Sequence, residues 1–399
     1  MSRFTNREER HLHNFHDPDQ FSCSPFDAGC DWAGAWNCMA SCQDRESAAS
    51  AGVFLAALDR GLRDLYPGYP AFVMATGIIS NALYFRELFQ LSQFFFLINL
   101  VAYPILVIAI VARLVRHSVA IRADLLDPRQ VFSFFTIVAA TNVLGIQCDL
   151  RGYSGISVAL WLFALVAWFA LLYFSFAVLT FLNTARDANV VHGGWLIAIV
   201  GTQSLVLLGV RVAGYLSAYS VGLIVLAHML WGIGLALYAI FVTLFSYRIF
   251  FFKLTPDDLS PLLWVIMGAA AISANAGTSL LLSSVHVPYL MNMKPFIDGV
   301  TLIVWAWGTW WIPLLVFFGV WKHLVCRVPL SYSPALWSLV FPLGMYSVAT
   351  FRFSLAAQIP FMGYLGREFV WVAVPAWFVT AFAMAISNIR WLIKAIKPV

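Results

Sequence analysis

Long apolar stretches follow one another along most of the chain, and they come in pairs. The first stretch of each pair opens on a proline or on two glycines, and a second, longer stretch follows it. Proline is accepted in the first turn of a helix, because the amide hydrogen that it lacks would have no helical partner there. The five openings are Tyr69-Pro70, Asp127-Pro128, Gly193-Gly194, Ser260-Pro261 and Ser333-Pro334. The pattern predicts an internal repeat of five helical hairpins.

Each stretch has about the length that a helix needs to cross a membrane, roughly 20 residues. The ten predicted helices cover 66–85, 94–115, 130–148, 156–183, 194–216, 220–247, 261–284, 296–322, 334–352 and 369–393. A membrane β-barrel would instead need strands of about 10 residues with alternating polarity, and these runs are too long and too uniformly apolar. We therefore predict an all-α integral membrane protein, with ten transmembrane helices as five helical hairpins around a central pore.

The composition agrees with this pattern. The 399 residues are 61% hydrophobic and 11% charged, whereas a soluble domain carries roughly 25% charged residues. We expect a pore domain over 66–393, preceded by a disordered polar tail over 1–50 and a short cytoplasmic surface helix over 51–65, and followed by a cytoplasmic C-terminus over 394–399. The tail holds Cys23, Cys30, Cys38 and Cys42. Their spacing matches no standard zinc pattern, so we expect no metal site and no cofactor.

Basic residues collect on one side of the predicted bundle. One set of connections holds Arg60, Arg63, Arg113, Arg116, Arg122, Arg129, Arg186, Arg248, Lys253, Lys322, Arg327, Arg390, Lys394 and Lys397. The opposite set holds Arg86, Arg151, Lys294 and Arg367. Because basic residues stay in the cytoplasm, we expect both termini on the cytoplasmic side of a plasma membrane, or of the inner membrane of a bacterium. The net charge of +5 reflects this topology and indicates no nucleic-acid partner.

The two helices of each predicted hairpin differ in composition. The first helices are rich in Gly, Ser, Thr, Asn and Gln, whereas Leu, Phe, Trp, Ile and Val dominate the second helices. Small residues allow close approach, while branched and aromatic residues suit lipid. One interpretation is that the glycines only serve packing between helices. We favour the other, that the first helices line a pore, with contributions from Thr76, Gly77, Asn142, Gly201, Gln203, Gly268, Asn275 and Gly344.

A narrow point is predicted at one depth of this pore. Counting seven positions from each opening residue leads to Gly77, Phe135, Gly201, Gly268 and Phe341. Three glycines leave room there, and an apolar plug blocks ions by dewetting. Pro342 would kink its helix toward the axis. We predict Phe341, and with it Phe135, as the gate; the alternative is that both are ordinary core residues.

Two segments resemble a known family. Tyr66-Pro67-Gly68-Tyr69-Pro70-Ala71-Phe72-Val73-Met74-Ala75-Thr76-Gly77-Ile78 is similar to the first-helix signature of the tellurite-resistance/dicarboxylate transporter (TDT) family, and Trp337-Ser338-Leu339-Val340-Phe341-Pro342-Leu343-Gly344 to its ninth-helix signature. Members include the bacterial tellurite-resistance protein TehA, yeast malate and sulfite transporters and plant slow anion channels. The resemblance implies ten helices, a pore closed by a phenylalanine at the position of Phe341, and a homotrimer.

The acidic residues that follow the tail favour an anion as the solute. They fall in loops or at the ends of the predicted helices, and we expect none in the middle of a helix. Ion-coupled transporters usually keep a buried carboxylate, and cation pores usually show an acidic ring. Arg211 and Arg352 lie near the outer ends of their helices. We predict that they form an electropositive outer vestibule; the alternative is that both snorkel to the interface.

These observations predict a protein that passes small anions through its pore, either dicarboxylates such as malate or inorganic anions, and that is not an enzyme. Its partners would be the anion and the lipid bilayer. A proton-linked C4-dicarboxylate carrier is the alternative within the family. A haem-binding membrane oxidoreductase subunit would need histidines that face one another, and only His228 lies in the middle of a predicted helix. The tryptophans are interpreted as interface anchors.

Overall fold

The computed structural model describes residues 52, 54–182 and 192–396. All regular structure in these ranges is helical. The chain divides into two compact units, Met1–Arg60 with Leu392–Val399, and Gly61–Trp391. Residues 54–60 and 392–396 of the first unit are helical. The predicted tail over 1–50, with its four cysteines, lies outside the described residues.

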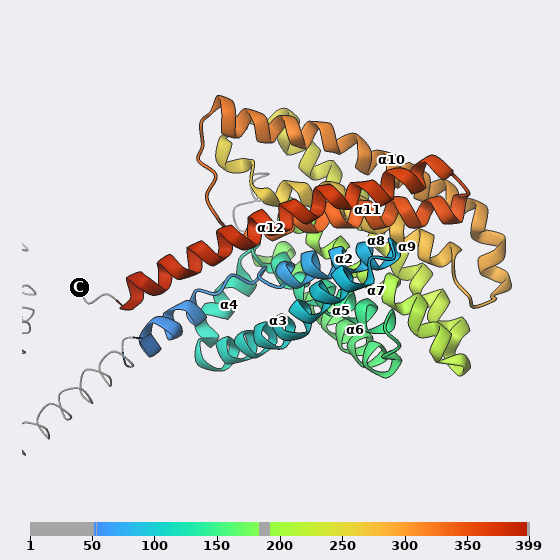
Figure 1. Cartoon of the computed structure of the whole chain (residues 1–399), viewed down its shortest axis with the longest axis horizontal. Helices are drawn as coiled ribbons and strands as arrows, with labels where there is room; N and C mark the ends of the chain where they lie inside the picture. The colour runs from blue at the N-terminus through green and yellow to red at the C-terminus, as the bar shows by residue number, and fades with distance from the viewer. Residues whose placement is uncertain (1–51, 53, 183–191, 397–399) are drawn as a thin grey trace, which may run out of the picture. The chain divides into compact units, whose positions relative to one another are not determined.

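Five helical hairpins make up the second unit, apart from the last residues of the fifth hairpin, 392–396, which belong to the first unit (Figure 1). The hairpins are α2 Ala71–Phe85 with α3 Phe89–Arg116, α5 Phe135–Asp149 with α6 Ser154–Ala177, α7 Ile197–Tyr215 with α8 Ser220–Phe251, α9 Val265–Leu281 with α10 Pro288–Val320, and α11 Trp337–Ala357 with α12 Pro360–Ile396. A short helix, α4 (Ser118–Leu126), lies between the first two hairpins. Among the described residues, 9 helical segments are long and apolar enough to cross a membrane, and α2 is a shorter apolar helix. The all-α membrane fold is therefore confirmed.

Four of the five hairpins open in the same way. A 3₁₀ turn directly precedes α5, α7, α9 and α11, and these turns are η2 Val131–Phe134, η5 Gly193–Leu196, η8 Pro261–Trp264 and η10 Pro334–Leu336. Short 3₁₀ turns are frequent at helix termini, and proline occupies the first turn in η8 and η10. The shared opening supports the internal repeat that the sequence predicted.

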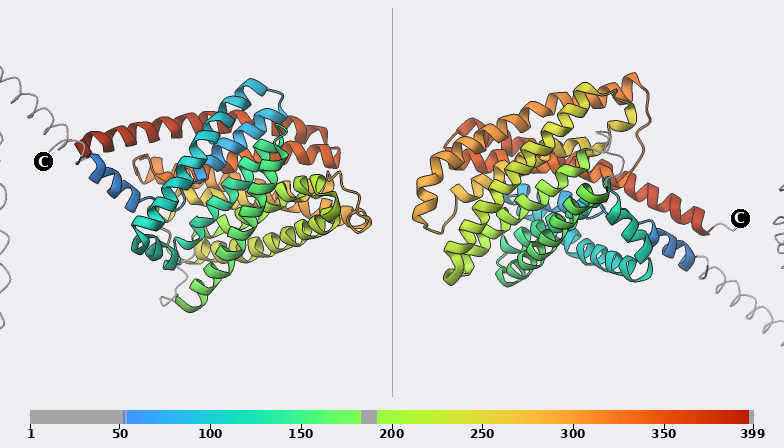
Figure 2. Two further views of the ribbon diagram at one scale, coloured as in Figure 1. Left: turned by 90° about the horizontal axis from the view of Figure 1, so that it is seen from below. Right: turned by 180° about the vertical axis from the view of Figure 1, so that it is seen from behind.

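The first helices of the hairpins form a closed ring. α2 packs against α5, α5 against α7, α7 against α9, α9 against α11, and α11 against α2. We call these five the inner helices. The peripheral helices pack onto them, with α3 on α2, α6 on α5, α8 on α7 and α10 on α9, and Trp377 of α12 donates a hydrogen bond to Thr76 of α2. Figure 2 shows the hairpins from two further sides.

Burial separates the two layers. In the most apolar 18-residue window of each helix, 72% to 94% of the residues are buried in α5, α7, α9 and α11 with their opening turns. In the five peripheral helices the buried share is 17% to 33%. Large side chains such as Val115, Phe169 and Phe382 are exposed on the peripheral helices. Apolar side chains directed outward fit a surface that faces lipid, as the difference in composition predicted.

Two peripheral helices begin earlier than predicted. α10 begins at Pro288 and α12 at Pro360, rather than at 296 and 369. Charged residues interrupt the apolar runs there, Lys294 in α10 and Arg367 and Glu368 in α12, so hydropathy alone missed the early starts. Asp298 and Glu368 therefore lie well inside α10 and α12, and the expectation that the acidic residues fall only in loops or at helix ends was wrong for these two. Glu368 forms an ion pair with Arg86 at 2.9 Å.

Candidate functional site

Phe341 lies inside the ring, in the second turn of α11. Its side chain is 2% exposed. Among the described residues it makes no contact with another aromatic ring, although α11 carries Trp337 and Tyr346, which do. Phe341 is thus buried without an aromatic neighbour among the described residues. This is the environment expected of an apolar plug, and equally of a core residue.

Two glycine contacts hold α11 around Phe341. The next residue, Pro342, faces α9, where a Cβ added to Gly268 would lie 2.7 Å from the proline Cγ. On the other side, a Cβ added to Gly344 would lie 2.7 Å from Ile78 Cγ2 of α2. Because Pro342 has no amide hydrogen, the carbonyl of Ser338 loses its helical partner. The segment that bears Phe341 therefore lacks one helical hydrogen bond, and it is closely packed against α9 and α2.

Phe135 lies in an aromatic cluster. Its ring stacks on Phe132 with centroids 6.1 Å apart, and Phe132 in turn contacts Trp195 at 5.6 Å and Phe241 of α8 at 5.7 Å. A Cβ on Gly201 would lie 3.1 Å from Phe135 Cδ1. No ring contact joins Phe135 to Phe341 among the described residues. The role of Phe135 as a second gate residue stays a prediction, and its contacts are those of a packing residue.

The predicted pore glycines lie at helix–helix contacts. Gly201, Gly268 and Gly344 approach their neighbouring inner helices as described above, and a Cβ on Gly77 would lie 2.8 Å from Asn99 Nδ2 and 3.2 Å from Gln147 Oε1. These contacts support the packing interpretation that the sequence left open. A pore-lining role for the glycine backbone remains a prediction.

Three of the predicted polar lining residues form hydrogen bonds that bridge helices. Thr76 accepts from Trp377 Nε1 of α12 at 2.9 Å, and Gln203 Nε2 donates to the carbonyl of Trp231 in α8 at 3.2 Å. Asn142 Nδ2 donates to Ser204 Oγ of α7 at 2.9 Å. Thr76 and Gln203 thus connect the two layers, whereas Asn142 joins two inner helices.

Three further tryptophans of the peripheral helices donate hydrogen bonds to the inner helices and so also connect the two layers. Trp168 donates to Thr202 Oγ1 at 2.7 Å, Trp231 to the carbonyl of Ser273 at 3.0 Å, and Trp305 to Thr350 Oγ1 at 2.8 Å. The sequence interpretation as interface anchors missed this role for these three residues. The signal available in the sequence was that α6, α8, α10 and α12 each carry tryptophan, while the inner helices carry hydroxyl residues.

Arg352 lies near the end where each inner helix turns into its peripheral helix, which we call the hairpin end. Its Nη1 donates to Asn275 Oδ1 at 2.7 Å and to Ser279 Oγ at 2.8 Å, both from α9. In the described part of the chain, no carboxylate lies within ion-pair distance of Arg352. A partly buried guanidinium held by neutral groups keeps its full positive charge available to an anion.

Arg352 and Phe341 share one face of α11. They are separated by about three helical turns, which brings the two side chains back to nearly the same direction. Met345 lies between them and accepts a hydrogen bond from Asn275 Nδ2 at 3.6 Å. A face of α11 that directs Phe341 toward the ring axis therefore directs Arg352 there too, roughly 16 Å farther along the helix.

Arg211, the second predicted vestibule residue, is in a different situation. Its guanidinium forms an ion pair with Asp149 at the end of α5, and Tyr215 Oη donates to the other oxygen of Asp149 at 2.6 Å. The charge of Arg211 is thus compensated within the protein. The structure brings both predicted arginines to the hairpin end, and of these two only Arg211 has an acidic partner among the described residues.

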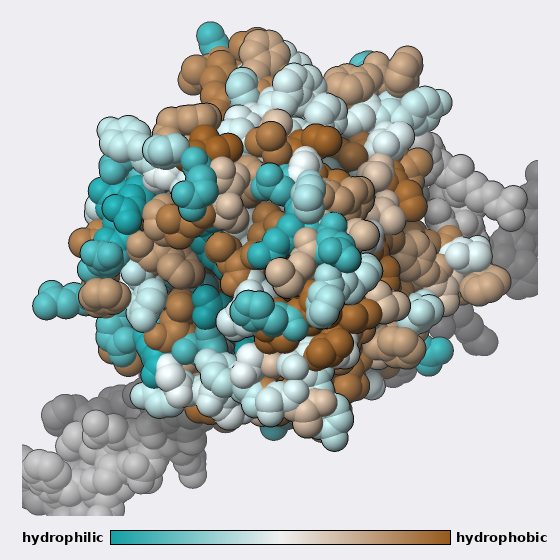
Figure 3. Space-filling view, turned by 90° about the vertical axis from the view of Figure 1, so that its right-hand side faces the viewer, coloured by the Kyte–Doolittle hydropathy of each residue, from teal (hydrophilic) through white to brown (hydrophobic). Residues whose placement is uncertain are grey.

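Asn81 of α2 was not among the predicted site residues. It is 2% exposed, and its Oδ1 has no hydrogen-bond partner among the described residues. Asn81 precedes Phe85 by one helical turn and shares its face, and the ring of Phe85 lies 5.8 Å from the Arg352 guanidinium. We group Asn81, Asn275, Ser279 and Arg352 as the mouth cluster. Figure 3 views the hairpin end, where hydrophilic side chains lie in the middle of the face as well as at its edge.

Histidines have other roles in the described residues. His192 caps η5: its Nδ1 accepts from the amide of Gly194 at 2.9 Å, and its Nε2 lies 2.5 Å from the carbonyl of Arg129. Burial lowers the pKa of His192 from 6.5 to about 4. His228 packs against the rings of Trp231 and Tyr289. No group of three or more metal-binding side chains occurs among the residues that the structure describes.

Comparison with known proteins gives the family. The model of the voltage-dependent anion channel family matches residues 64–385. An uncharacterized membrane protein of Mycobacterium tuberculosis is 42% identical over 137 residues, which are 34% of this chain and 69% of the relative. An uncharacterized transporter of Methanocaldococcus jannaschii is 26% identical over 322 residues, 78% of this chain and 91% of the relative. The family match covers most of the chain, which therefore belongs to the voltage-dependent anion channel family, the family of the sequence resemblance.

Proposed function

From this family membership, we propose that the protein passes small anions down their gradient through the centre of the inner ring, with Phe341 as the gate. The observation that carries the proposal is the charge of Arg352, which neutral groups hold on the same face of α11 as Phe341. Amide and hydroxyl groups solvate an anion without trapping it, and permeation needs weak binding of this kind. Malate-like dicarboxylates and inorganic anions both fit these groups.

The proposal is tested by replacing Arg352 and measuring anion-replacement currents of purified protein in planar bilayers. Arg352→Gln keeps hydrogen-bond donors for Asn275 and Ser279 but removes the charge. A charge at the mouth acts over about 10 Å at 0.1 M salt and over about 30 Å at 0.01 M. We therefore expect the conductance of Arg352→Gln to fall most at low ionic strength, while Arg352→Lys retains most of it.

Arg367 provides the matched control for this test. It is an exposed cation near the same end of the bundle, and its guanidinium lies over the ring of Phe351. Arg367→Gln removes the same charge outside the mouth cluster. Equal losses in Arg352→Gln and Arg367→Gln would show that only the net surface charge matters, and would contradict a binding role for Arg352.

One observation favours a second candidate, a proton-linked C4-dicarboxylate carrier. Asp298 lies inside α10, and its Oδ1 is buried without a hydrogen-bond partner among the described residues. A carboxylate within a membrane helix is a common proton site. Reversal potentials that follow an imposed pH gradient in the wild type, and cease to do so in Asp298→Asn, would replace the channel with the carrier.

We also propose that both termini lie in the cytoplasm and that the protein assembles as a homotrimer in a plasma membrane or bacterial inner membrane. The distribution of basic residues supports the orientation, and the family resemblance supports the trimer. A C-terminal reporter active only in the cytoplasm tests the first statement. The mass of the complex in lipid nanodiscs tests the second.

A further inference from the structure

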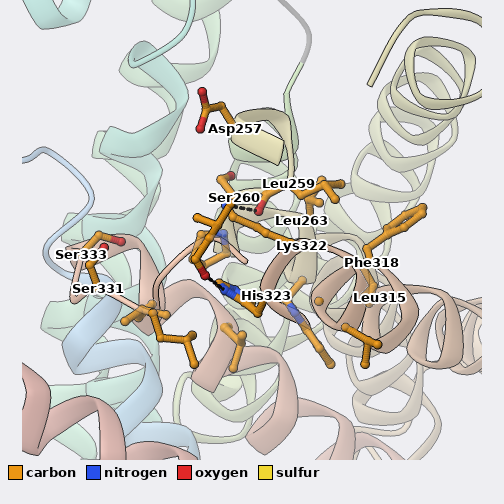
Figure 4. Close-up of a pocket in the computed structure, with 18 of the residues that line it drawn as sticks. Asp257, Leu259, Ser260, Leu263, Leu315, Phe318, Lys322, His323, Ser331 and Ser333 are labelled. Atoms are coloured by element: carbon orange, nitrogen blue, oxygen red, sulfur yellow. Dashed lines mark hydrogen bonds between the residues drawn. The ribbon is translucent and has the colours of Figure 1, made fainter. Parts of the chain in front are cut away.

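A pocket of about 510 Å³ lies at the end of the bundle opposite the hairpin end (Figure 4). Two connections form its walls, the segment that leads into α9 and the segment between α10 and α11. Ser260, Pro261 and Trp264 come from the first connection, and Lys322, His323 and Ser333 from the second. Nothing in the proposed anion pathway uses this pocket.

One part of the pocket is polar and basic. Lys322 Nζ donates one hydrogen bond, to the carbonyl of Leu259 at 2.9 Å, which leaves two of its three N–H groups free. No carboxylate is within ion-pair distance of Lys322 in the described residues. His323 Nδ1 lies 2.8 Å from the carbonyl of Val328 and donates to it, which fixes the ring at the wall of the pocket. Asp257, the acidic residue of the lining, lies at the edge of the pocket away from His323 (Figure 4).

The other part of the pocket is apolar and continues onto the surface of α10. Leu315, Phe318 and Leu336 line it. Val316 and Val320 also belong to the lining, and they are 49% and 45% exposed on the peripheral layer. A ligand in this pocket thus contacts cationic and hydroxyl groups at one end and a lipid-facing helix at the other.

We propose that this pocket binds an anionic phospholipid, with the phosphate between Lys322 and Ser331 and an acyl chain along Val316 and Val320. Phosphate esters are the anions for which an ammonium group and hydroxyls are suited. Basic pockets between helices on the cytoplasmic side are known binding sites for anionic lipid headgroups. The exposed valines favour a membrane lipid over a free phosphate, because a free phosphate has no apolar part that could contact them.

The pocket also touches the segment that bears the proposed gate. Ser333, Leu336 and Leu339 line it directly before Phe341. A bound lipid therefore fixes the opening turns of α11, and we infer that it changes the probability that the gate opens. This regulatory part rests on the proposed function, whereas lipid binding itself does not.

Binding is measured first, without transport. Purified full-length protein in a zwitterionic detergent is titrated with phosphatidylglycerol, with phosphatidylcholine and with glycerol phosphate, and bound lipid is counted by native mass spectrometry. Lys322→Gln keeps a donor for the Leu259 carbonyl but removes the charge. We expect phosphatidylglycerol to bind the wild type, and to bind Lys322→Gln roughly tenfold more weakly, the loss expected for one charge-assisted hydrogen bond.

Two further variants make the result specific. Ser331→Trp fills the pocket without changing the charge, and it should abolish the binding. Lys253→Gln removes an exposed lysine from the connection that leads to α9, outside the pocket, and it should bind like the wild type. Equal binding by Lys322→Gln and Lys253→Gln, or equal binding of phosphatidylcholine, overturns the site. If glycerol phosphate displaces phosphatidylglycerol completely, the ligand is a free phosphate ester and not a membrane lipid.

The regulatory part is tested by conductance in bilayers with and without phosphatidylglycerol. We expect the lipid to change the current of the wild type and of Lys253→Gln, but not that of Lys322→Gln. If phosphatidylglycerol binds but leaves the current unchanged, the binding site stands and the regulation is refuted. If the protein carries no anion current in any lipid, the proposed function fails while the binding result remains.

Discussion

Two arginines at the hairpin end carry the same charge in different surroundings. Asp149 compensates Arg211, whereas Asn275 and Ser279 leave the charge of Arg352 intact. A buried ion pair is costly to break, because the remaining charge loses its partner. Arg211 therefore serves to join α5 to α7, and of these two arginines Arg352 is the one whose charge is available to an anion. The conductance experiment on Arg352 follows from this difference.

Phe341→Ala is expected to raise the anion conductance. The ring is buried on the face of α11 that also carries Arg352, next to a proline that weakens the helix. Removing an apolar plug lets water and ions enter the narrow point. The loss of stability should be below the about 3–5 kcal/mol of a Phe→Ala change in a closed core, because water fills the space. Single-channel currents and thermal unfolding measure both effects.

Phe353→Ala is the control for this prediction. Phe353 is 1% exposed and lies on the same helix, about a third of a turn away from the face of Phe341. It should show the full loss of stability and no gain in conductance. Equal currents in the wild type and Phe341→Ala at equal surface expression would refute the gate assignment.

His192 is expected to make folding stability depend on pH. Burial holds its pKa at about 4, below the ordinary value of 6.5, so protonation favours the unfolded state. The free energy of unfolding should thus be unaffected by this group above about pH 7 and decrease as the pH falls from 6.5 toward 4. His192→Gln cannot be protonated there. The difference in melting temperature between wild type and variant, measured at pH 7.5 and 4.5, should shrink or reverse at the lower pH.

At the scale of helices, the two layers are joined by polar contacts from tryptophan. Trp168, Trp231, Trp305 and Trp377 each donate to an inner helix. In a bilayer no hydrophobic force drives one helix against another, so packing and hydrogen bonds determine which faces meet. These indole groups therefore help to fix how each peripheral helix is rotated against the ring.

Gly268→Ala is expected to disturb the contact between α9 and α11. The added methyl group would lie 2.7 Å from Pro342 Cγ and 3.1 Å from its Cβ, and overpacking of this kind costs about 1–3 kcal/mol. We expect a lower melting temperature and an altered open probability, since Phe341 is the residue next to Pro342. Thermal unfolding and single-channel recording check the two effects.

Gly232→Ala on α8 is the matched control, because a Cβ there meets nothing within 4 Å. Alanine also favours helix over glycine by about 1 kcal/mol, so this variant should be as stable as the wild type or more so. Identical behaviour of the two alanine variants would show that the fit between Gly268 and Pro342 is unimportant.

At the scale of the whole molecule, hydropathy predicted the two layers well. Helices that face lipid carry large apolar side chains, whereas the inner helices carry small and polar ones, and this difference is visible in the sequence. The repeated openings predicted the five hairpins for a similar reason, since proline and glycine act locally. The early starts of α10 and α12 were missed, because Lys294 interrupts the apolar run of α10 and Arg367 and Glu368 interrupt that of α12. The pairing of Arg211 with Asp149 was also missed, because it depends on which inner helices are neighbours.

Deleting residues 1–45 is expected to leave membrane insertion and anion transport unchanged. The family match begins only at residue 64, and the tail is polar with unpatterned cysteines. A deletion of residues 1–63 should instead lower stability, because it removes the Arg63 carbonyl that accepts from Arg113 Nε at 3.0 Å. Membrane-fraction yield, thermal unfolding and currents are compared for the two truncations. If the deletion of residues 1–45 abolishes transport, the tail with its four cysteines is needed for function.

The shortness of α2 has a consequence for the electrical behaviour of the protein. Its 15 residues extend over only about 22 Å, whereas the hydrocarbon layer is about 30 Å thick. The 28 residues of α3 beside it extend over about 42 Å. Where electrolyte reaches the ends of the short helix, the transmembrane voltage drops over a smaller distance than in the surrounding bilayer. An anion that crosses the ring is then driven by a steeper electric field than the membrane thickness alone would produce.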